Sequence, residues 1–306
     1  MKIKIILAFL GLFLLYRFVN RDSLMVVINR SLPEREAGLL AGMVVGDKQS
    51  MSKEFYELLK VTGLVHLVIV SGSNVMLLSR GLIEGLAGFL GRKKTIMMVL
   101  VLVWSYAAMV GWELPVVRAV LMVSIYYWAQ ILGKKFDVGR ALILVIGMMM
   151  LADWQMVKEA GFWLSVLAFT AVVLGRGLNI FWLTIWVSIW ITPVLAMVFG
   201  KISLISPLTN VAVLFLVETI TLVGAAGSVA GVFWMAAGKG ILWLIYPLLK
   251  YFVWVVEFFG SWKWTNVEIR FNWWLLIGWY MVLGWFLIKP RADTRVARTQ
   301  TARTRN

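Results

Sequence analysis

The chain carries its only histidine and a compact group of small polar residues inside the apolar run of residues 63–78. The group consists of His66, Ser71, Gly72, Ser73 and Asn74. A histidine and a serine can form a hydrolytic dyad, but a spacing of five residues places His66 and Ser71 about 140° apart around a helix. A Gly-x-Ser-x-Gly elbow is also missing. We therefore expect these groups either to line a watery path or to join helices by hydrogen bonds.

Ligands for a metal are scarce, because the chain has one histidine and no cysteine. A metallo-hydrolase site needs several histidine and carboxylate ligands. We expect no catalytic residues, no metal and no cofactor, so the chain is not predicted to be an enzyme. The absence of cysteine also excludes disulfide bonds.

Two charged residues, Arg118 and Glu218, interrupt apolar runs, where a central charge costs about 2.5–3.5 kcal/mol on insertion. Pro115 suits the first turn of a helix, so Arg118 should lie near the outer end of its span. It then either reaches to the lipid headgroups or faces an anion. Glu218 lies deep in its run, and it either pairs with an intramembrane base or handles protons or ions.

Three tryptophans, Trp182, Trp186 and Trp190, follow one another at intervals of four residues and share one face of a helix. Nucleic-acid bases can stack on such a stripe. We favour packing or contact with lipid, because tryptophan is abundant throughout this chain.

These residues lie in a chain of 306 residues of which 61% are hydrophobic, with a mean hydropathy of +0.87. A globule of this size has a largely wetted exterior and cannot hide so much apolar surface. The 17 Trp and 8 Tyr residues suit the interface between lipid headgroups and hydrocarbon. The sequence therefore predicts an all-α polytopic membrane protein.

Charges, prolines and glycines divide the chain into eleven candidate spans. They cover residues 5–19, 64–79, 95–112, 115–132, 139–152, 161–175, 178–200, 206–222, 223–238, 241–259 and 272–288. Eleven spans would leave the tail opposite the N-terminus, so at least one must be re-entrant, interfacial or wrongly divided, and residues 81–91 are a re-entrant candidate. The predicted fold is a bundle of about ten transmembrane helices with re-entrant or broken helices.

The predicted domains are an N-terminal transmembrane anchor over residues 1–19, a polar segment over 20–62, a transmembrane domain over 63–288 and a basic tail over 289–306. The polar segment is expected outside the cytoplasm or at an interface. The net charge of +15 partly reflects topology, because basic loops stay in the cytoplasm. This rule places Lys2, Lys4, the Arg92-Lys93-Lys94 run, Lys134-Lys135 and the tail inside, and the disordered tail is expected to attract anionic lipid.

Five short motifs follow one another in order. They are Gly46-Asp47; Thr62-Gly63-Leu64-Val65-His66-Leu67 with Ser71-Gly72; Pro115-Val116-Val117-Arg118-Ala119 with Met122; Gly161-Phe162-Trp163-Leu164-Ser165 after Asp153; and Phe199-Gly200-Lys201-Ile202-Ser203 leading to Pro207-Leu208-Thr209-Asn210. Over roughly residues 36–220 this order resembles the competence domain of the ComEC family, the inner-membrane channel for DNA in natural transformation. The resemblance implies that residues 63–288 form a competence-type transmembrane domain.

The chain departs from the family pattern in two ways. Family members commonly carry a second histidine where this chain has Asn74. Full-length members also have an external OB-like domain and a metallo-β-lactamase-like nuclease domain, and we expect neither in this chain. Strand degradation is then expected from a separate polypeptide.

The resemblance implies a multi-pass channel that takes up single-stranded DNA across the bacterial cytoplasmic membrane. Such a polyanion needs a wet path with countercharge, while its bases tolerate aromatic walls. The residues expected to line or gate this path are His66, Ser71, Gly72, Ser73, Asn74 and Arg118. The supporting motif positions are Asp47, Ser165, Pro207, Asn210 and Glu218.

The expected partners are single-stranded DNA, anionic lipid at the basic tail, a separate nuclease, a DNA receptor and a cytoplasmic motor, and a homo-oligomer is left open. The alternative function is a secondary transporter or channel for a small solute or ion, in which Glu218, His66 and Glu84 would couple or coordinate the solute. An intramembrane hydrolase that uses Ser71 or Ser73 is a further alternative.

Overall fold

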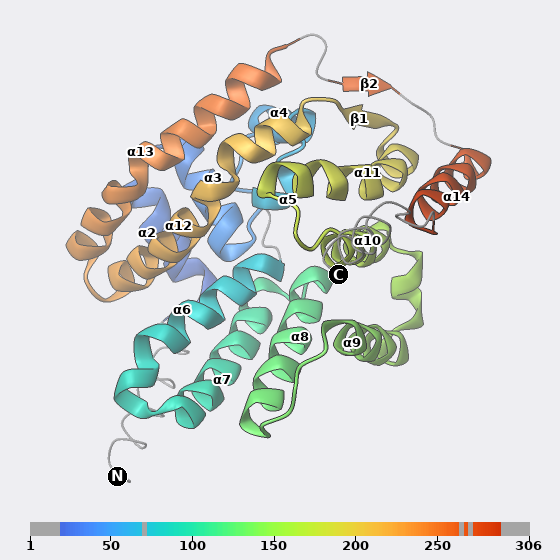
Figure 1. Cartoon of the computed structure of the whole chain (residues 1–306). Helices are drawn as coiled ribbons and strands as arrows, with labels where there is room; N and C mark the ends of the chain where they lie inside the picture. The colour runs from blue at the N-terminus through green and yellow to red at the C-terminus, as the bar shows by residue number, and fades with distance from the viewer. Residues whose placement is uncertain (1–18, 69–71, 263–265, 269–271, 289–306) are drawn as a thin grey trace, which may run out of the picture.

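The computed structural model describes residues 19–68, 72–262, 266–268 and 272–288, and these residues are mostly helical (Figure 1). Residues 1–18 of the predicted anchor and the predicted tail over 289–306 lie outside this description. The elements are α2 (Arg21–Ser31), α3 (Glu34–Val45), α4 (Lys53–Val61), α5 (Val65–Val68), α6 (Gly72–Leu90), α7 (Arg92–Val110), α8 (Leu114–Ile131), α9 (Val138–Ala152), the 3₁₀ helix η1 (Trp154–Lys158), α10 (Ala160–Leu174), α11 (Ile180–Phe199), β1 (Lys201–Ser203), α12 (Ser206–Phe233), α13 (Met235–Gly260), β2 (Asn266–Glu268) and α14 (Trp273–Ile288).

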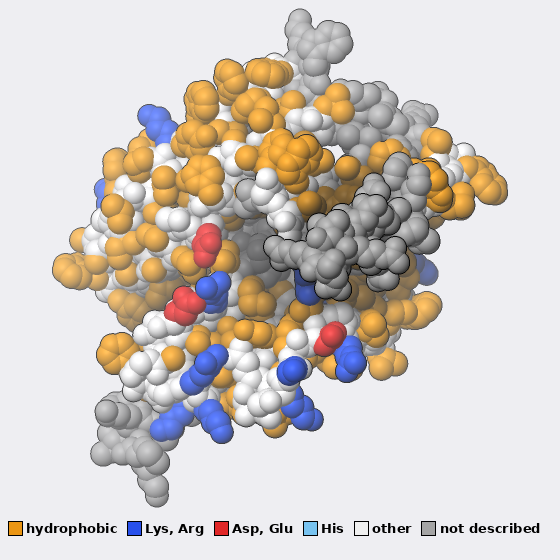
Figure 2. Space-filling view, viewed as in Figure 1, with side chains coloured by type: hydrophobic (Ala, Val, Ile, Leu, Met, Phe, Trp, Pro, Cys, Tyr) orange, Lys and Arg blue, Asp and Glu red, His pale blue; other side chains and the backbone are white. Residues whose placement is uncertain are grey.

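Four of these helices, α7, α8, α12 and α13, are long and apolar enough to cross a membrane. Four shorter apolar stretches lie in α9, α10, α11 and α14. Hydrophobic side chains cover much of the visible surface (Figure 2), as expected of helices that face lipid. The prediction of an all-helical, polytopic membrane protein is confirmed.

The first bundle consists of α2, α3, α4, α5, α12 and α13, and it therefore joins early and late parts of the chain around one hydrophobic core. Helix α3 is buried from Glu36 to Val45. Helices α12 and α13 form a hairpin in which Gly231 and Gly238 face each other so closely that a Cβ on Gly238 would overlap the backbone of Gly231. Small residues of this kind let membrane helices approach and gain packing energy.

The second bundle consists of α6, α7 and α8, which share a core of mostly valine side chains together with Tyr127. Helix α9 packs on α8, and α10 packs on both α8 and α11. Helix α11 then returns to α12 in the first bundle (Figure 1). Strands β1 and β2 pair antiparallel, and α14 contacts α11.

Two polar contacts tie the bundles together. The hydroxyl of Tyr106 in α7 donates to the carbonyl oxygen of Val44 in α3 at 2.9 Å. The Lys48 ammonium lies 3.2 Å from the carboxylate of Glu113, the residue that caps the start of α8. Helices α6 and α12 also touch, so the second bundle is anchored to the first along α3 and α12.

The structure divides the second half differently from the sequence prediction. Helix α12 runs unbroken from Ser206 to Phe233 through the boundary expected at residues 222 and 223, because Gly224, Gly227 and Ser228 lie buried at helix contacts instead of ending the helix, and α13 begins at Met235. Ser228 bonds within the helix, donating to the Gly224 carbonyl at 2.7 Å. The three spans expected between residues 206 and 259 are therefore two helices, α12 and α13.

The first half also differs in its division. The span expected over residues 64–79 is split, since α5 ends at Val68 and α6 begins at Gly72. Residues 81–90, which belonged to the re-entrant candidate, continue α6 as a regular helix. An ion pair between Arg80 and Glu84, four residues apart at 2.7 Å, supports this continuation.

Candidate functional site

The turn at Thr62 and Gly63 lies against the first turn of α12. The Thr209 hydroxyl donates to the Thr62 carbonyl oxygen at 2.8 Å, and both residues are fully buried. Gly63 has a φ of +73°, and a Cβ placed on it would lie 2.5 Å from Oγ of Ser206. Two of the sequence motifs, which are 147 residues apart, are therefore in direct contact.

Local chemistry produces this turn. Thr62 caps the C-terminus of α4, and the amide of Leu64 donates to the carbonyl of Leu59 at 2.9 Å across a left-handed glycine. The chain then enters α5, which packs on α3 where Gly42 leaves space for Val68. The motif that holds His66 is thus fixed on two sides, by α3 and by α12.

The residues predicted to gate the path lie where the chain passes from the first bundle to the second. His66 is exposed on α5 and hydrogen-bonds to the backbone of Gly63. Gly72, Ser73 and Asn74 form the first turn of α6. Ser71, and the side chains of Ser73 and Asn74, lie outside the part of the chain that the structure describes.

Arg118 lies one turn inside α8 and is only 7% exposed. It stands two residues from Val116 and Val120, which pack in the second core, so it occupies the opposite face of α8. Its Nη1 atom has no hydrogen-bond partner among the described residues. A side chain that reaches to the headgroups would expose its tip, whereas this guanidinium is buried with a donor free for an acceptor.

Asp47 lies next to the contact between the bundles. It follows Gly46, the left-handed residue that ends α3. Its carboxylate accepts hydrogen bonds from Nη2 of Arg21 at 3.0 Å and from the amide of Gln49 at 3.1 Å. The next residue, Lys48, pairs with Glu113 at the start of α8, so this motif positions the helix that carries Arg118.

The supporting positions of α10 and α12 have different surroundings. Pro207 is the second residue of α12, where its missing amide hydrogen costs nothing. Asn210 is 6% exposed and donates to Oγ of Ser206 at 3.2 Å, while its Oδ1 has no partner in the described part of the chain. Ser165 is half-buried in α10.

Glu218 lies exposed on α12 and forms no ion pair within 4 Å with another described residue. Arg80 of α6 interacts electrostatically with it while pairing with Glu84. The structure thus gives Glu218 a nearby cation, Arg80 of α6, but no direct ion pair with it. Helices α6 and α12 touch, so this carboxylate lies near their contact.

The tryptophan stripe of α11 takes part in packing. Trp186 donates from Nε1 to the Ala171 carbonyl of α10 at 3.0 Å, and its ring lies 5.9 Å from that of Trp190. Trp190 in turn lies 6.2 Å from the ring of Tyr280 in α14. Trp182 alone of the three is mostly exposed, at 56%, so the stripe joins three helices.

The sequence motifs contain Thr62 and Thr209 but do not predict that the two residues touch. They also do not predict the contacts of Tyr106 with Val44 or of Lys48 with Glu113. A buried threonine needs a partner for its hydroxyl, but the Thr62 hydroxyl donates to carbonyls of its own helix, and the contact with α12 uses the Thr62 carbonyl. Among the described residues no group of three or more histidine or acidic side chains is arranged to hold a metal ion.

Comparison with known proteins covers the same motifs. A family model described as Competence protein matches residues 43–292. The chain is 25% identical over 159 residues to the ComE operon protein 3 of Bacillus subtilis (strain 168), a stretch that makes up 52% of this chain and 20% of that protein. The match thus spans about a fifth of that relative, and no solved structure shows a significant match. The family model covers most of the chain, including Arg118 and the contact between the Thr62 turn and α12. The chain therefore belongs to the competence protein family.

Proposed function

We propose that this chain is a multi-pass protein of the bacterial cytoplasmic membrane that provides a path for single-stranded DNA during competence. The observation that carries the proposal is Arg118, a buried guanidinium with a free donor on the face of α8 that turns away from the second core. Membership of the competence family supports the choice of DNA as the anion.

The chemistry of the proposed path follows from what DNA requires. A phosphate that leaves water needs a countercharge, and arginine keeps its charge and offers a planar set of donors that matches phosphate oxygens. The bases need no specific partner, because apolar and aromatic walls accept them. Arg118 would therefore contact passing phosphates one at a time.

The segment from His66 to Asn74 is the proposed gate. It joins the two bundles, and its α5 end is held by Gly63 against Ser206 of α12. Small residues at the start of α6 offer hydroxyl and amide groups without bulk. A shift of α6 relative to α12 would therefore move this segment while α5 stays in place.

The proposal assigns transport and no chemical step to this chain. Strand degradation, capture of duplex DNA and the driving force would come from a separate nuclease, a DNA receptor and a cytoplasmic motor. The marker experiment below does not depend on whether several copies assemble into a homo-oligomer.

The test is acquisition of a genomic marker from added DNA in a competent host whose own channel gene is deleted. We compare the wild-type chain with Arg118→Met, Arg118→Lys and the control Arg176→Met, which alters an exposed arginine in the turn after α10. A charge-assisted hydrogen bond of about 1.5–3 kcal/mol corresponds to a roughly 10- to 150-fold loss of transfer for Arg118→Met. Arg118→Lys should lose less, and Arg176→Met should match the wild type.

Membrane abundance is measured beside marker transfer, and two outcomes of the experiment would contradict the proposal. At equal membrane abundance, Arg118→Met should fold at least as well as the wild type, because it removes a buried charge. Equal marker transfer by Arg118→Met and the wild type would contradict the role of Arg118. No transfer by the wild type, with nuclease, receptor and motor supplied, would contradict DNA conduction and favour a small-solute transporter that uses Glu218.

A further inference from the structure

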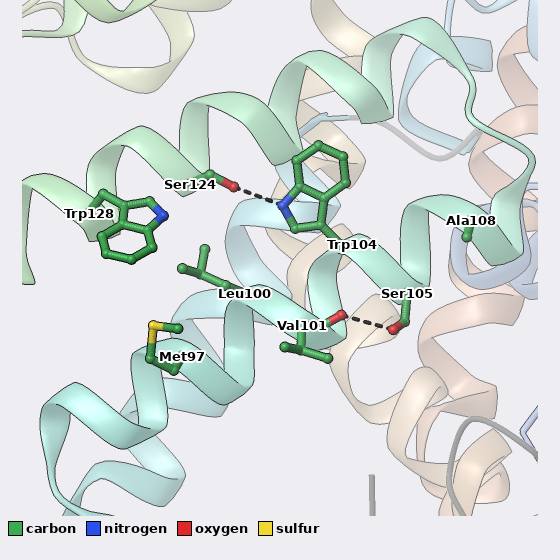
Figure 3. Close-up of a pocket in the computed structure, with 8 residues that line it drawn as sticks. All are labelled: Met97, Leu100, Val101, Trp104, Ser105, Ala108, Ser124 and Trp128. Atoms are coloured by element: carbon green, nitrogen blue, oxygen red, sulfur yellow. Dashed lines mark hydrogen bonds between the residues drawn. The ribbon is translucent and has the colours of Figure 1, made fainter. Parts of the chain in front are cut away.

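A groove opens on the outer side of the α7–α8 hairpin, with a volume of about 640 Å³ (Figure 3). Its walls are mainly apolar and include Met97, Val101, Trp104 and Trp128. Nε1 of Trp104 donates to Oγ of Ser124 at 3.2 Å, which fixes the indole across the gap between the helices. The polar groups lining the groove are therefore largely satisfied, and an apolar occupant suits it.

The length of the groove matches one leaflet of a bilayer. Its lining runs along α7 from Met97 to Ala108, which is about 16 Å of helix. Half of a hydrocarbon core of about 30 Å is about 15 Å. A single acyl chain standing in one leaflet would thus fill the groove along its length.

One end of the groove adjoins a cluster of basic residues. The cluster consists of Arg92, Lys93, Lys94, Lys134 and Lys135, all exposed. Lys93 lies one helical turn before Met97, and the Lys134 amide closes the last turn of α8 by donating to the Ala129 carbonyl at 2.9 Å. Figure 2 shows basic side chains gathered along this edge of the molecule.

This cluster holds unneutralised charge. Arg92 donates to the amide oxygen of Gln130 at 3.0 Å, which brings the ends of α7 and α8 together. None of the five side chains forms an ion pair within 4 Å with any residue in the described ranges. An apolar groove of one leaflet's depth therefore ends at free positive charge.

We propose that the α7–α8 groove binds an anionic phospholipid, with one acyl chain between Trp104 and Trp128 and the phosphate at Lys93, Lys94, Lys134 and Lys135. The charge of the cluster complements the headgroup, and the groove accepts the chain. A DNA strand would also satisfy the lysines and stack bases on the tryptophans, so displacement by an oligonucleotide is one outcome of the test below. The inference does not depend on DNA conduction, because it concerns the outer face of the hairpin.

The test uses the full-length protein purified in detergent and native mass spectrometry with phosphatidylglycerol or phosphatidylcholine of the same acyl chains. The headgroup variant is Lys93→Gln with Lys94→Gln, and its control is Lys239→Gln with Lys250→Gln, which removes equal charge from exposed sites on α13. The groove variant is Val101→Trp, and its control is Val172→Trp on α10; the two valines are 45% and 44% exposed.

The wild type should retain one phosphatidylglycerol in preference to phosphatidylcholine. The headgroup variant should lower that preference by roughly fivefold for each lysine. Val101→Trp should abolish retention of both lipids, and both controls should behave as the wild type does. Equal retention of the two lipids by the wild type would overturn the proposal. So would a control that loses as much as its partner variant, or displacement of the lipid by a single-stranded oligonucleotide.

Discussion

Replacing Gly63 by alanine should weaken the contact between the Thr62–Gly63 turn and α12. Two costs add at this position. The left-handed conformation, with φ at +73°, costs an alanine about 1–2 kcal/mol. The new methyl group would lie 2.5 Å from Oγ and 2.6 Å from Cβ of Ser206, and such overpacking costs about 1–3 kcal/mol. The expected loss in the free energy of unfolding is therefore about 2–5 kcal/mol.

A matched control separates these two costs. Gly133 has a φ of +64°, and nothing lies within 4 Å of a Cβ placed on it. Gly133→Ala should therefore lose only the backbone part, about 1–2 kcal/mol. The assay is equilibrium unfolding of the purified protein by titration of sodium dodecyl sulfate into mild detergent micelles, followed by tryptophan fluorescence.

A second variant tests the cause of the clash. Ser206→Gly removes both atoms that the new methyl group would meet, at the cost of the hydrogen bond from Asn210 at 3.2 Å. In the double variant, alanine at 63 should cost about 1–3 kcal/mol less than it does alone. A Gly63→Ala loss no larger than that of Gly133→Ala, or costs that simply add in the double variant, would refute this account of the contact.

Two other contacts give smaller and more local effects. Thr209→Val removes the only described side-chain donor to the buried Thr62 carbonyl, so the free energy of unfolding should fall by about 1–3 kcal/mol. The control is Thr170→Val, whose hydroxyl bonds to its own helix. Equal losses in the two variants would contradict the role of the contact. The partly exposed Lys48–Glu113 pair should contribute less than about 1 kcal/mol to the free energy of unfolding. Lys48→Glu should therefore lower marker transfer more than stability, and adding Glu113→Lys should restore both. If the double variant restores neither, the two charges do not interact.

The sequence predicted the fold class well, since the apolar runs and the aromatic residues at their ends have no soluble alternative. It failed at the boundaries where glycine has two meanings. Gly224 and Gly227 suggested a break, yet in α12 they provide space for Leu40 and Leu242. Whether a glycine ends a helix or admits a neighbour depends on the neighbour, and a single sequence does not give that contact.

In the candidate site, too, the sequence indicated which residue types matter but not which residues they contact. Arg118 stood out because a charge in an apolar run is costly, but the choice between headgroups and an anion depended on its burial, which the sequence pattern does not give. The contact between Thr62 and Thr209 joins residues 147 positions apart. No periodicity within either motif encodes such a pairing, which joins the Thr209 hydroxyl to the backbone carbonyl of Thr62.

The composition of the first bundle has a consequence for biosynthesis. Its core combines residues up to Val68 with residues from Val213 onward, so the early helices leave the ribosome well before the hairpin that covers them. About 145 residues separate these positions, and synthesis at about 5–20 residues per second would take roughly 7 to 30 s. During that time α3, which is apolar from Ala37 to Val45, must be sheltered by lipid or by the insertion machinery, which makes the delay itself a hazard for this chain.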